Sequence, residues 1–352
     1  KIEDQNISEG ITRKRTVGLF GELKLGWQNA LFLTATGRND WSSTLPKDKR
    51  SFFYPSVGVS AVITDLFKNA GNDITSSNGL SYLQLRSTWA KVGKDAPIGA
   101  LESSPSTNIN SLASSAYTWN GVDVGNPNLE PEFTNSFEIG IDMRLFENRV
   151  GLDLTYYTSK SENQILRDIR VPPTTGTFYA TLNGGSITNN GLEALLTVKV
   201  LPHTSDFKWN VDFNFGMNES TVNELPGFLN EVYLSDSWTF NATAAGAAIL
   251  DGSLFGLRGY RPKRNDNGET IINSNGLPTL VVETYDDVTR MPDWTLGISN
   301  TFAYKDFKLS FLLDIVQGVD VYNATESALV YYGLSKQTLN RNETIVLPGV
   351  DS

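Results

Sequence analysis

Residues able to carry enzymatic or metal chemistry are few in this chain. It has no cysteine and a single histidine, His203, directly after Pro202. Disulfides and thiolate metal ligands are therefore excluded, and only His203 offers a histidine base for a nucleophile. We expect His203 to be an exposed turn residue and expect no cofactor, no metal and no enzymatic activity. Long loops can bring carboxylates together, so a barrel enzyme stays open as an alternative.

One segment has some features of a calcium loop. Lys263 to Gly268 reads Lys-Arg-Asn-Asp-Asn-Gly, with the glycine at the sixth position. An EF-hand loop needs an oxygen ligand at its first position, where this chain has the cation of Lys263. The segment is therefore predicted to be a polar turn.

The elements that would position any site are strands. About ten segments alternate apolar and polar residues, so each has one apolar and one polar face. The clearest cover residues 17–27, 137–145, 150–157, 209–215 and 308–315, and weaker ones cover 30–41, 52–64, 82–92, 191–201 and 294–304.

The links between these strands are alternately short and long. Short ones cover 28–29, 147–149, 202–206 and 305–306, a somewhat longer one covers 65–81 with a helical turn near 65–70, and long ones cover 42–51, 93–133, 163–190 and 216–292. In an antiparallel sheet all the long links then lie at one edge. This arrangement predicts an all-β fold, an up-and-down transmembrane β-barrel of the outer-membrane type.

A soluble β-sandwich also alternates, so it stays open as an alternative. Two features favour the barrel. Apolar bands of about 9–11 residues suit tilted strands that cross a bilayer. Aromatic residues occur at both ends of these bands, as in membrane-interface girdles: Trp27, Trp209 and Tyr304 beside short turns, and Tyr156, Phe215 and Trp294 beside long loops.

Composition argues against two classes of protein, those that bind nucleic acid and those that cross a membrane with helices. The net charge is −10, which argues against nucleic acid. No stretch approaches 18 consecutive apolar residues, so a transmembrane helix is not expected.

Several strings resemble one family when taken in order. Residues 125–132 read GNPNLEPE before a strand, and two prolines there favour an extended approach. The chain also contains FYPSVG at 53–58, GSITNNGLE at 185–193, MPDW at 291–294 and YKDF at 304–307. Together these strings resemble the SusC/RagA family of TonB-dependent outer-membrane transporters over nearly the whole chain.

The resemblance implies a 22-stranded barrel in the bacterial outer membrane, surrounded by outer-membrane lipid, with an N-terminal plug inside. It also implies energy from the TonB complex through that plug, a SusD-like surface lipoprotein as partner, and oligosaccharide or oligopeptide cargo. Only about ten strands are visible, with no plug, no TonB box and no closing strands. Residues 1–352 are therefore expected to be a partial barrel domain from the C-terminal half.

This interpretation assigns two sets of residues. Acids on the polar strand faces are expected to face the lumen, and loop aromatics are candidates for contact with cargo. A short helix is also expected within 324–334. The alternative is a surface glycan-binding β-sandwich without a transport role. The lumen-facing acids are Glu138, Asp142, Asp153, Asp212 and Asp314, and the loop aromatics are Tyr117, Trp119, Phe178, Tyr179, Trp238 and Tyr260.

Overall fold

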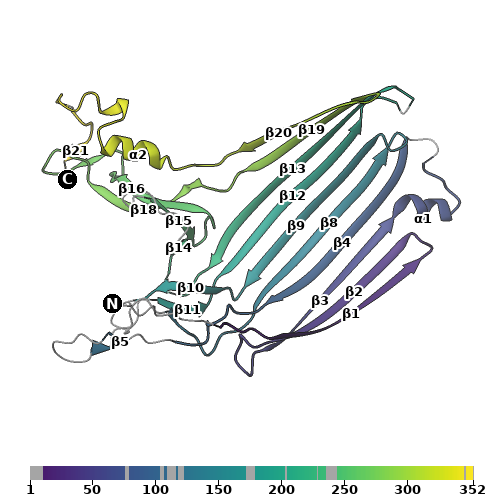
Figure 1. Ribbon diagram of the computed structural model, residues 1–352, viewed down its shortest axis with the longest axis horizontal. Coiled ribbons are helices and arrows are strands. Elements are labelled where there is room, and N and C mark those ends of the chain that lie inside the picture. Colours follow the sequence, from purple (N-terminus) through teal and green to yellow (C-terminus); the bar gives the residue numbers. More distant parts are fainter. Residues whose placement is uncertain are drawn as a thin grey trace, which may run out of the picture. The chain divides into compact units, whose positions relative to one another are not determined.

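A computed structural model describes residues 11–75, 79–103, 107–108, 116–117, 123–171, 179–202, 204–227, 229–234, 244–344 and 346–351. Ten long strands form one sheet, ordered as they occur along the chain (Figure 1). The predicted strands are all present, and most are longer than predicted. They are β1 (Thr16–Trp27), β2 (Leu31–Ser42), β3 (Ser51–Val62), β4 (Leu80–Lys94), β8 (Glu132–Leu145), β9 (Val150–Glu162), β12 (Ser186–Lys199), β13 (Phe207–Glu224), β19 (Trp294–Tyr304) and β20 (Phe307–Gln317).

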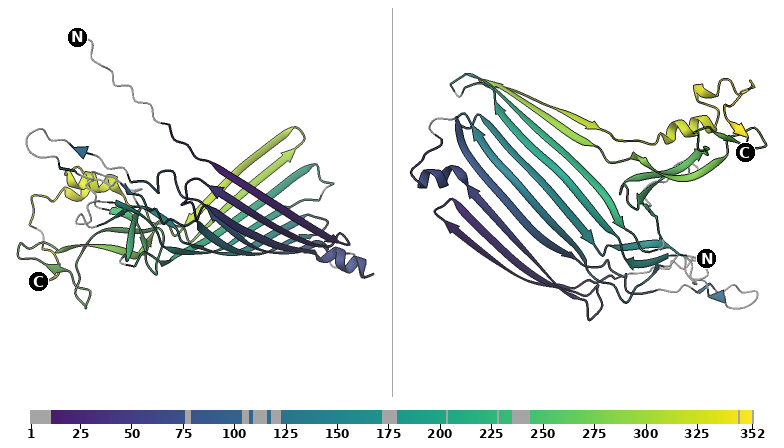
Figure 2. Two further views of the ribbon diagram at one scale, coloured as in Figure 1. Left: turned by 90° about the horizontal axis from the view of Figure 1, so that it is seen from below. Right: turned by 180° about the vertical axis from the view of Figure 1, so that it is seen from behind.

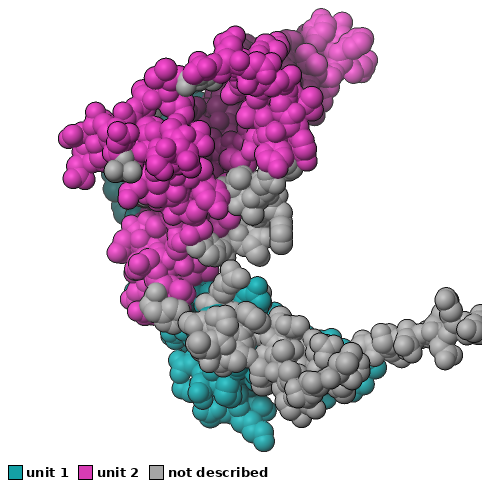
Figure 3. All heavy atoms as spheres, turned by 90° about the vertical axis from the view of Figure 1, so that its left-hand side faces the viewer, with its two compact units in different colours: residues 1–186 teal, residues 187–352 magenta. Residues whose placement is uncertain are grey.

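The chain divides into two compact units, and in each of them the long strands form a single layer (Figure 2). Unit 1 covers residues 1–186 and unit 2 covers residues 187–352, coloured teal and magenta in Figure 3. The single layer differs from the two packed sheets of a β-sandwich. We describe each unit by itself.

One face of the unit 1 strands is apolar from strand to strand. Leu25 of β1 lies opposite Leu33 of β2, which lies opposite Val59 of β3. On β8 and β9, Ile139 lies opposite Tyr156. These five side chains are between 37% and 53% exposed, so no second layer of described residues covers them. An apolar face of this kind requires an apolar environment.

The opposite face of unit 1 is polar, and Arg86 spans three of its strands. Arg86 of β4, Gly140 of β8 and Thr155 of β9 lie in one cross-strand row. The guanidinium donates to the Asp153 carboxylate at 3.0 and 2.5 Å and to Thr155 Oγ1 at 2.6 Å. A Cβ at position 140 would lie 2.5 Å from Arg86 Nε. Glycine at this position therefore lets the arginine lie flat across β8.

Short turns join the strands at one edge of unit 1. Gln28 and Asn29 have φ of 51° and 52°. Two successive positive φ angles match the right-handed twist of the hairpin strands. Phe146, Glu147 and Asn148 are three consecutive left-handed residues, with φ of 53°, 58° and 62°. The longer link holds helix α1 (Ile63–Asn69), as predicted near 65–70.

Unit 2 repeats the two-faced pattern. Phe213 of β13 lies opposite Ile298 of β19, which lies opposite Leu313 of β20. The neighbouring residue Leu312 lies opposite Ser299, on the polar face. Leu312 and Leu313 are 63% and 53% exposed. They are adjacent in sequence but point to opposite sides of the sheet.

An aromatic cluster on this apolar face surrounds one polar side chain. The rings of Trp209 and Phe302 stack with centroids 5.6 Å apart, and Phe302 stacks on Phe311 at 6.1 Å. Asn300 is 9% exposed and accepts a hydrogen bond from Trp209 Nε1 at 3.2 Å. The amide is tolerated on an apolar surface because its oxygen is satisfied.

The long links are more regular than the predicted loops. They contain further strands that lack long alternation, and this is why the sequence pattern missed them. Unit 1 contains β5 (Thr107–Asn108), β6 (Ala116–Tyr117), β7 (Asp123–Val124), β10 (Ile165–Arg170) and β11 (Tyr179–Asn183). Unit 2 contains the four-stranded sheet β14 (Glu231–Leu234), β15 (Ala244–Ile249), β16 (Gly256–Pro262) and β18 (Leu280–Thr289), together with β17 (Ile271–Ile272), β21 (Val350–Asp351), helix α2 (Ala324–Tyr331) and a 3-10 turn (Lys336–Thr338).

The segment that resembled a calcium loop is a turn, as predicted. Asn265 Oδ1 accepts hydrogen bonds from the backbone N–H groups of Asn267 and Glu269 at 3.0 and 2.9 Å. Gly268 takes φ of 81°. Asn265 thus forms an Asx turn.

Small cores lie under the long links. In unit 1 the buried cluster consists of Leu45, Phe52, Ala96, Ala100 and Leu129. In unit 2 a smaller cluster contains Ile187, Val222 and Ala248. Leu129 from the string at 125–132 belongs to the unit 1 cluster, and Tyr54 from the string at 53–58 packs against it. Among the described residues, no helix is long and apolar enough to cross a membrane.

A partly exposed ion pair fixes the segment before β1. Lys14 Nζ lies 2.7 Å from the carboxylate of Asp95, which also accepts a hydrogen bond from Ser42 Oγ at 2.5 Å. Burial alone would raise the pKa of Asp95, but the hydrogen bonds from Lys14 and Ser42 outweigh it and lower the pKa below its usual value.

Candidate functional site

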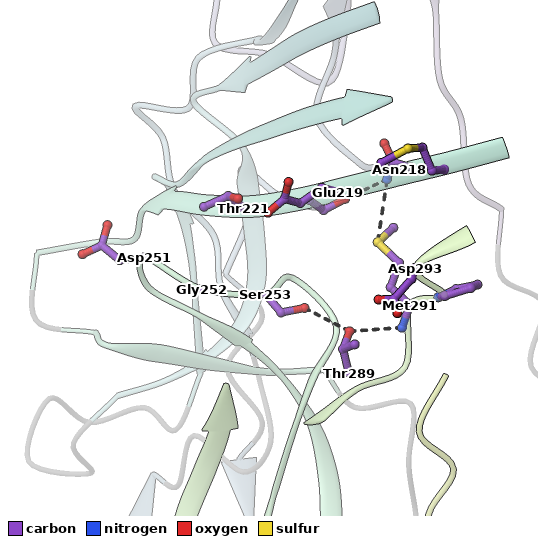
Figure 4. Close-up of a pocket in the computed structure, with 12 residues that line it drawn as sticks. Asn218, Glu219, Thr221, Asp251, Gly252, Ser253, Thr289, Met291 and Asp293 are labelled. Atoms are coloured by element: carbon purple, nitrogen blue, oxygen red, sulfur yellow. Dashed lines mark hydrogen bonds between the residues drawn. The ribbon is translucent and has the colours of Figure 1, made fainter. Parts of the chain in front are cut away.

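A pocket of about 440 Å³ in unit 2 is the candidate site (Figure 4). It forms where β13 continues past its partner β19, because the register between these strands ends at Gly216 and Thr295. Three segments far apart in sequence line it: residues 217–221, residues 251–253, and Thr289 together with residues 291–293.

Local contacts hold the three segments in place. Val222 of β13 is 1% exposed and belongs to the unit 2 core, which anchors the first segment. Thr221 forms an isolated antiparallel bridge with Ser253. The turn just before Ser253 is tight, because Asp251 takes φ of 57° and Gly252 N donates to Ile249 O at 3.0 Å. The Asp251 N–H ties this turn to β13 by donating to Val222 O at 2.8 Å.

The third segment is fixed by side chains. Thr289 Oγ1 lies 3.3 Å from Ser253 Oγ and accepts a hydrogen bond from Met291 N at 3.2 Å. Asn218 Nδ2 points to Met291 Sδ at 3.7 Å, as the dashed line in Figure 4 shows. These contacts place a thioether in the pocket wall.

Glycine shapes the position of one carboxylate. Gly318 has φ of 80°, and a Cβ there would overlap the carboxylate of Asp293. The Asp293 N–H donates to Gln317 O at 2.9 Å. Asp293 is thus held at the start of β19 with its carboxylate against Gly318.

The pocket has an acidic and partly apolar lining. Its three ionisable side chains are Glu219, Asp251 and Asp293, and neither lysine nor arginine lines it. Among the described residues, none of the three carboxylates has a hydrogen bond or an ion pair. Met217, Met291 and Pro292 supply apolar surface. Within the described chain, no cluster of His, Cys, Asp or Glu is arranged to bind a metal.

The predicted acids lie on polar strand faces. Asp142 lies directly opposite Asp153, and Glu138 lies opposite Thr88 of β4. In unit 2, Asp212 lies opposite Ser299 and Asp314 lies opposite Gly297. That these faces line a lumen stays a prediction.

Two of the predicted loop aromatics, Tyr179 and Tyr260, lie on strands outside this pocket. Tyr260 lies on β16 with 56% of its surface exposed, and Tyr179 is half-buried on β11. Neither lines the pocket. The backbone of Tyr117 lies in β6. Trp119, Phe178 and Trp238, like His203, fall outside the described residues.

Sequence reasoning missed the pocket because its segments are far apart. Only residues 291–294 were singled out, and that was for their resemblance to a family. A usable signal was the polar run 218–221 that follows the clear strand 209–215.

An antiparallel sheet with an exposed apolar face and a polar face defines an integral membrane β-barrel protein. Comparison with known proteins gives the family. The family model described as TonB dependent receptor-like, beta-barrel matches residues 3–342. The chain therefore belongs to the TonB-dependent receptor-like β-barrel family.

Curated relatives carry matching names. The chain is 28% identical over 332 residues to TonB-dependent receptor P26 of Formosa agariphila, covering 86% of this chain and 32% of the relative. It is 26% identical over 319 residues to TonB-dependent receptor SusC of Bacteroides thetaiotaomicron, covering 86% and 31%. The chain spans about a third of the length of the curated relatives it matches.

Solved structures agree on the fold. The structure of the RagAB peptide transporter matches with a TM-score of 0.66 at 21% identity, covering 86% of this chain and 33% of that one. The predicted SusC/RagA resemblance, the barrel fold and the outer-membrane location are thus confirmed. The family consists of receptors and transporters, which are not enzymes.

Proposed function

We propose that this chain forms part of the wall of an outer-membrane active importer whose apolar face meets lipid and whose polar face lines the lumen. The in-register apolar rows are the observation that carries the proposal. Leu25, Leu33 and Val59 are direct cross-strand neighbours on three successive strands, and all three are exposed. Hydrocarbon is the environment that makes such a row stable.

The edges of the sheet support a larger barrel. β1 and β20 are long strands at the two ends of the strand order. Long apolar edge strands invite pairing, and barrels avoid this by closing. We infer that residues outside this sequence complete the ring and supply the plug.

Cargo and partners follow from the relatives by analogy. RagAB is a peptide transporter, and SusC is a TonB-dependent receptor. We infer energisation by TonB, capture together with a SusD-like surface lipoprotein, and import of oligopeptides or oligosaccharides. No covalent chemistry is needed, because binding in a concave mouth gives specificity.

A deletion strain tests this proposal. Uptake of labelled oligopeptides and oligosaccharides is measured in the wild type, in the deletion strain and in a strain lacking TonB. We expect one cargo class to be lost in both mutant strains. Equal uptake of every cargo in all three strains contradicts the proposal.

The lipoprotein partner is tested separately. Receptor extracted from outer membranes in mild detergent is expected to copurify with a lipoprotein of the SusD type. If the receptor purifies without a lipoprotein while import is intact, the proposed partner is refuted and the import function is not.

A further inference from the structure

We propose that the 440 Å³ pocket at the end of β13 binds the lysine or arginine side chain of an oligopeptide. The inference rests on the proposed import function and deepens it by naming a cargo class. It concerns only unit 2 and needs no contact with unit 1.

Charge is the first argument. Glu219, Asp251 and Asp293 line one pocket without any cation in its lining. Among the described residues these carboxylates have no partner that neutralises them. Like charges that line a concave surface focus a negative potential. A cationic group relieves their repulsion, whereas a carboxylate or sulfate group adds to it.

The apolar wall is the second argument, and it is independent of charge. Met217, Met291 and Pro292 line the same pocket. Lysine and arginine carry an apolar stem below a charged head, and such stems pack on apolar surface. Methionine adapts its shape to irregular apolar ligands. A bare ammonium or metal ion would make no use of this wall.

The wall offers a sugar no aromatic ring, and several of its hydroxyls are already engaged. Ser220 Oγ lies 2.5 Å from Asn189 Oδ1, and Ser253 Oγ and Thr289 Oγ1 already lie 3.3 Å apart. These hydroxyls are engaged with protein partners. No aromatic side chain lines the pocket, so the lining offers no ring on which a sugar face could stack.

Size fits one residue with its neighbouring backbone. Ligand pockets for small molecules span about 300–1,000 Å³, and this one lies at the lower end. A lysine side chain entering between β13 and residues 291–293 would place its stem against Met291, with its ammonium in the negative potential of the acidic lining.

Binding of matched peptides to the intact receptor, purified from outer membranes, tests the inference. The probes are Ala-Ala-Lys-Ala-Ala and the same peptide with norleucine, which keeps the stem and removes the charge. Exposed ion pairs contribute modestly, so we expect the lysine peptide to bind about tenfold more tightly at low salt. We expect added salt to reduce this ratio.

Charge-neutral variants locate the preference. In Glu219→Gln/Asp293→Asn the lysine peptide is expected to bind as weakly as the norleucine peptide. The matched control is Glu283→Gln, an exposed residue of β18 outside the pocket. We expect this control to keep the full preference.

The inference is overturned if the wild-type receptor binds both peptides equally, or if the double variant loses both peptides to the same extent. It is also overturned if the receptor binds uncharged oligosaccharides and the double variant abolishes that binding. Uptake in the deletion strain separates this failure from failure of the import proposal. If the receptor imports cargo but does not prefer lysine- or arginine-containing peptides, the import proposal is still supported and only the assignment of the pocket is refuted.

Discussion

Replacing Gly140 with alanine tests how the polar face is held together. The new methyl group would lie 2.5 Å from Arg86 Nε and 2.7 Å from Arg86 Cζ, so the guanidinium must move. Its hydrogen bonds to Asp153 and Thr155 are then lost. Because the Arg86 and Asp153 side chains are 35% and 41% exposed, screening limits this loss to about 1–2 kcal/mol.

Alanine also restricts the unfolded chain, which stabilises a strand by roughly 0.5 kcal/mol relative to glycine. The net cost of Gly140→Ala is therefore about 1 kcal/mol. Gly297→Ala is the matched control, since its Cβ would meet only ordinary contacts, the nearest at 3.6 Å. We expect the control to be neutral or slightly stabilising.

The assay is urea unfolding of the purified receptor in detergent micelles, followed by the circular dichroism of its strands. Gly140→Ala should lower the midpoint, and the same change in an Arg86→Ala background should not. The reasoning would be refuted if Gly140→Ala and Gly297→Ala changed the urea midpoint equally. It would also be refuted if Gly140→Ala lowered the midpoint as much in the Arg86→Ala background as in the wild type.

Three further predictions follow from other contacts. Leu313→Arg should block assembly of the barrel, because arginine on the lipid-facing side costs about 2–4 kcal/mol in the bilayer. Leu312→Arg, on the opposite face, should still assemble. The heat-modifiable band of folded barrel in outer-membrane fractions measures this difference. Because the pKa of Asp95 is lowered, its stabilisation is present above its unfolded pKa and is lost as pH falls through the folded value. Proteolysis before β1 should therefore increase in acid, and Asp95→Asn should show the faster cleavage already at pH 7. Trp209→Phe should destabilise by about 1–3 kcal/mol because Asn300 loses its donor, and adding Asn300→Val should recover most of this loss in thermal melts.

The membrane-facing strands could be predicted from sequence because each carries its own signal. Residues such as Leu309 and Phe311 alternate with polar neighbours, and a period of two needs no tertiary information. Strand ends were less predictable. β13 continues to Glu224 because its last residues pair with loop segments. These residues do not face an apolar environment on one side, so they need not alternate between apolar and polar types.

The candidate site could not be predicted in the same way. Glu219, Asp251 and Asp293 come from three segments, and only folding brings them around one pocket. Their approach depends on backbone features such as the positive φ of Asp251 and the bare α-carbon of Gly318. Tyr260 lies on a strand outside the pocket, and contact of the loop aromatics with cargo stays a prediction.

The link between β13 and β19 has a consequence for the order of folding. Hairpins such as β19–β20 close across two residues and can form within microseconds. β13 and β19 must instead meet across residues 225–293, and each doubling of loop length adds about 0.6 kcal/mol of closure entropy. The four-stranded sheet within this link shortens the free chain that must be ordered. We expect β13–β19 pairing to follow formation of that sheet, so that the pocket is completed only when this late pairing occurs.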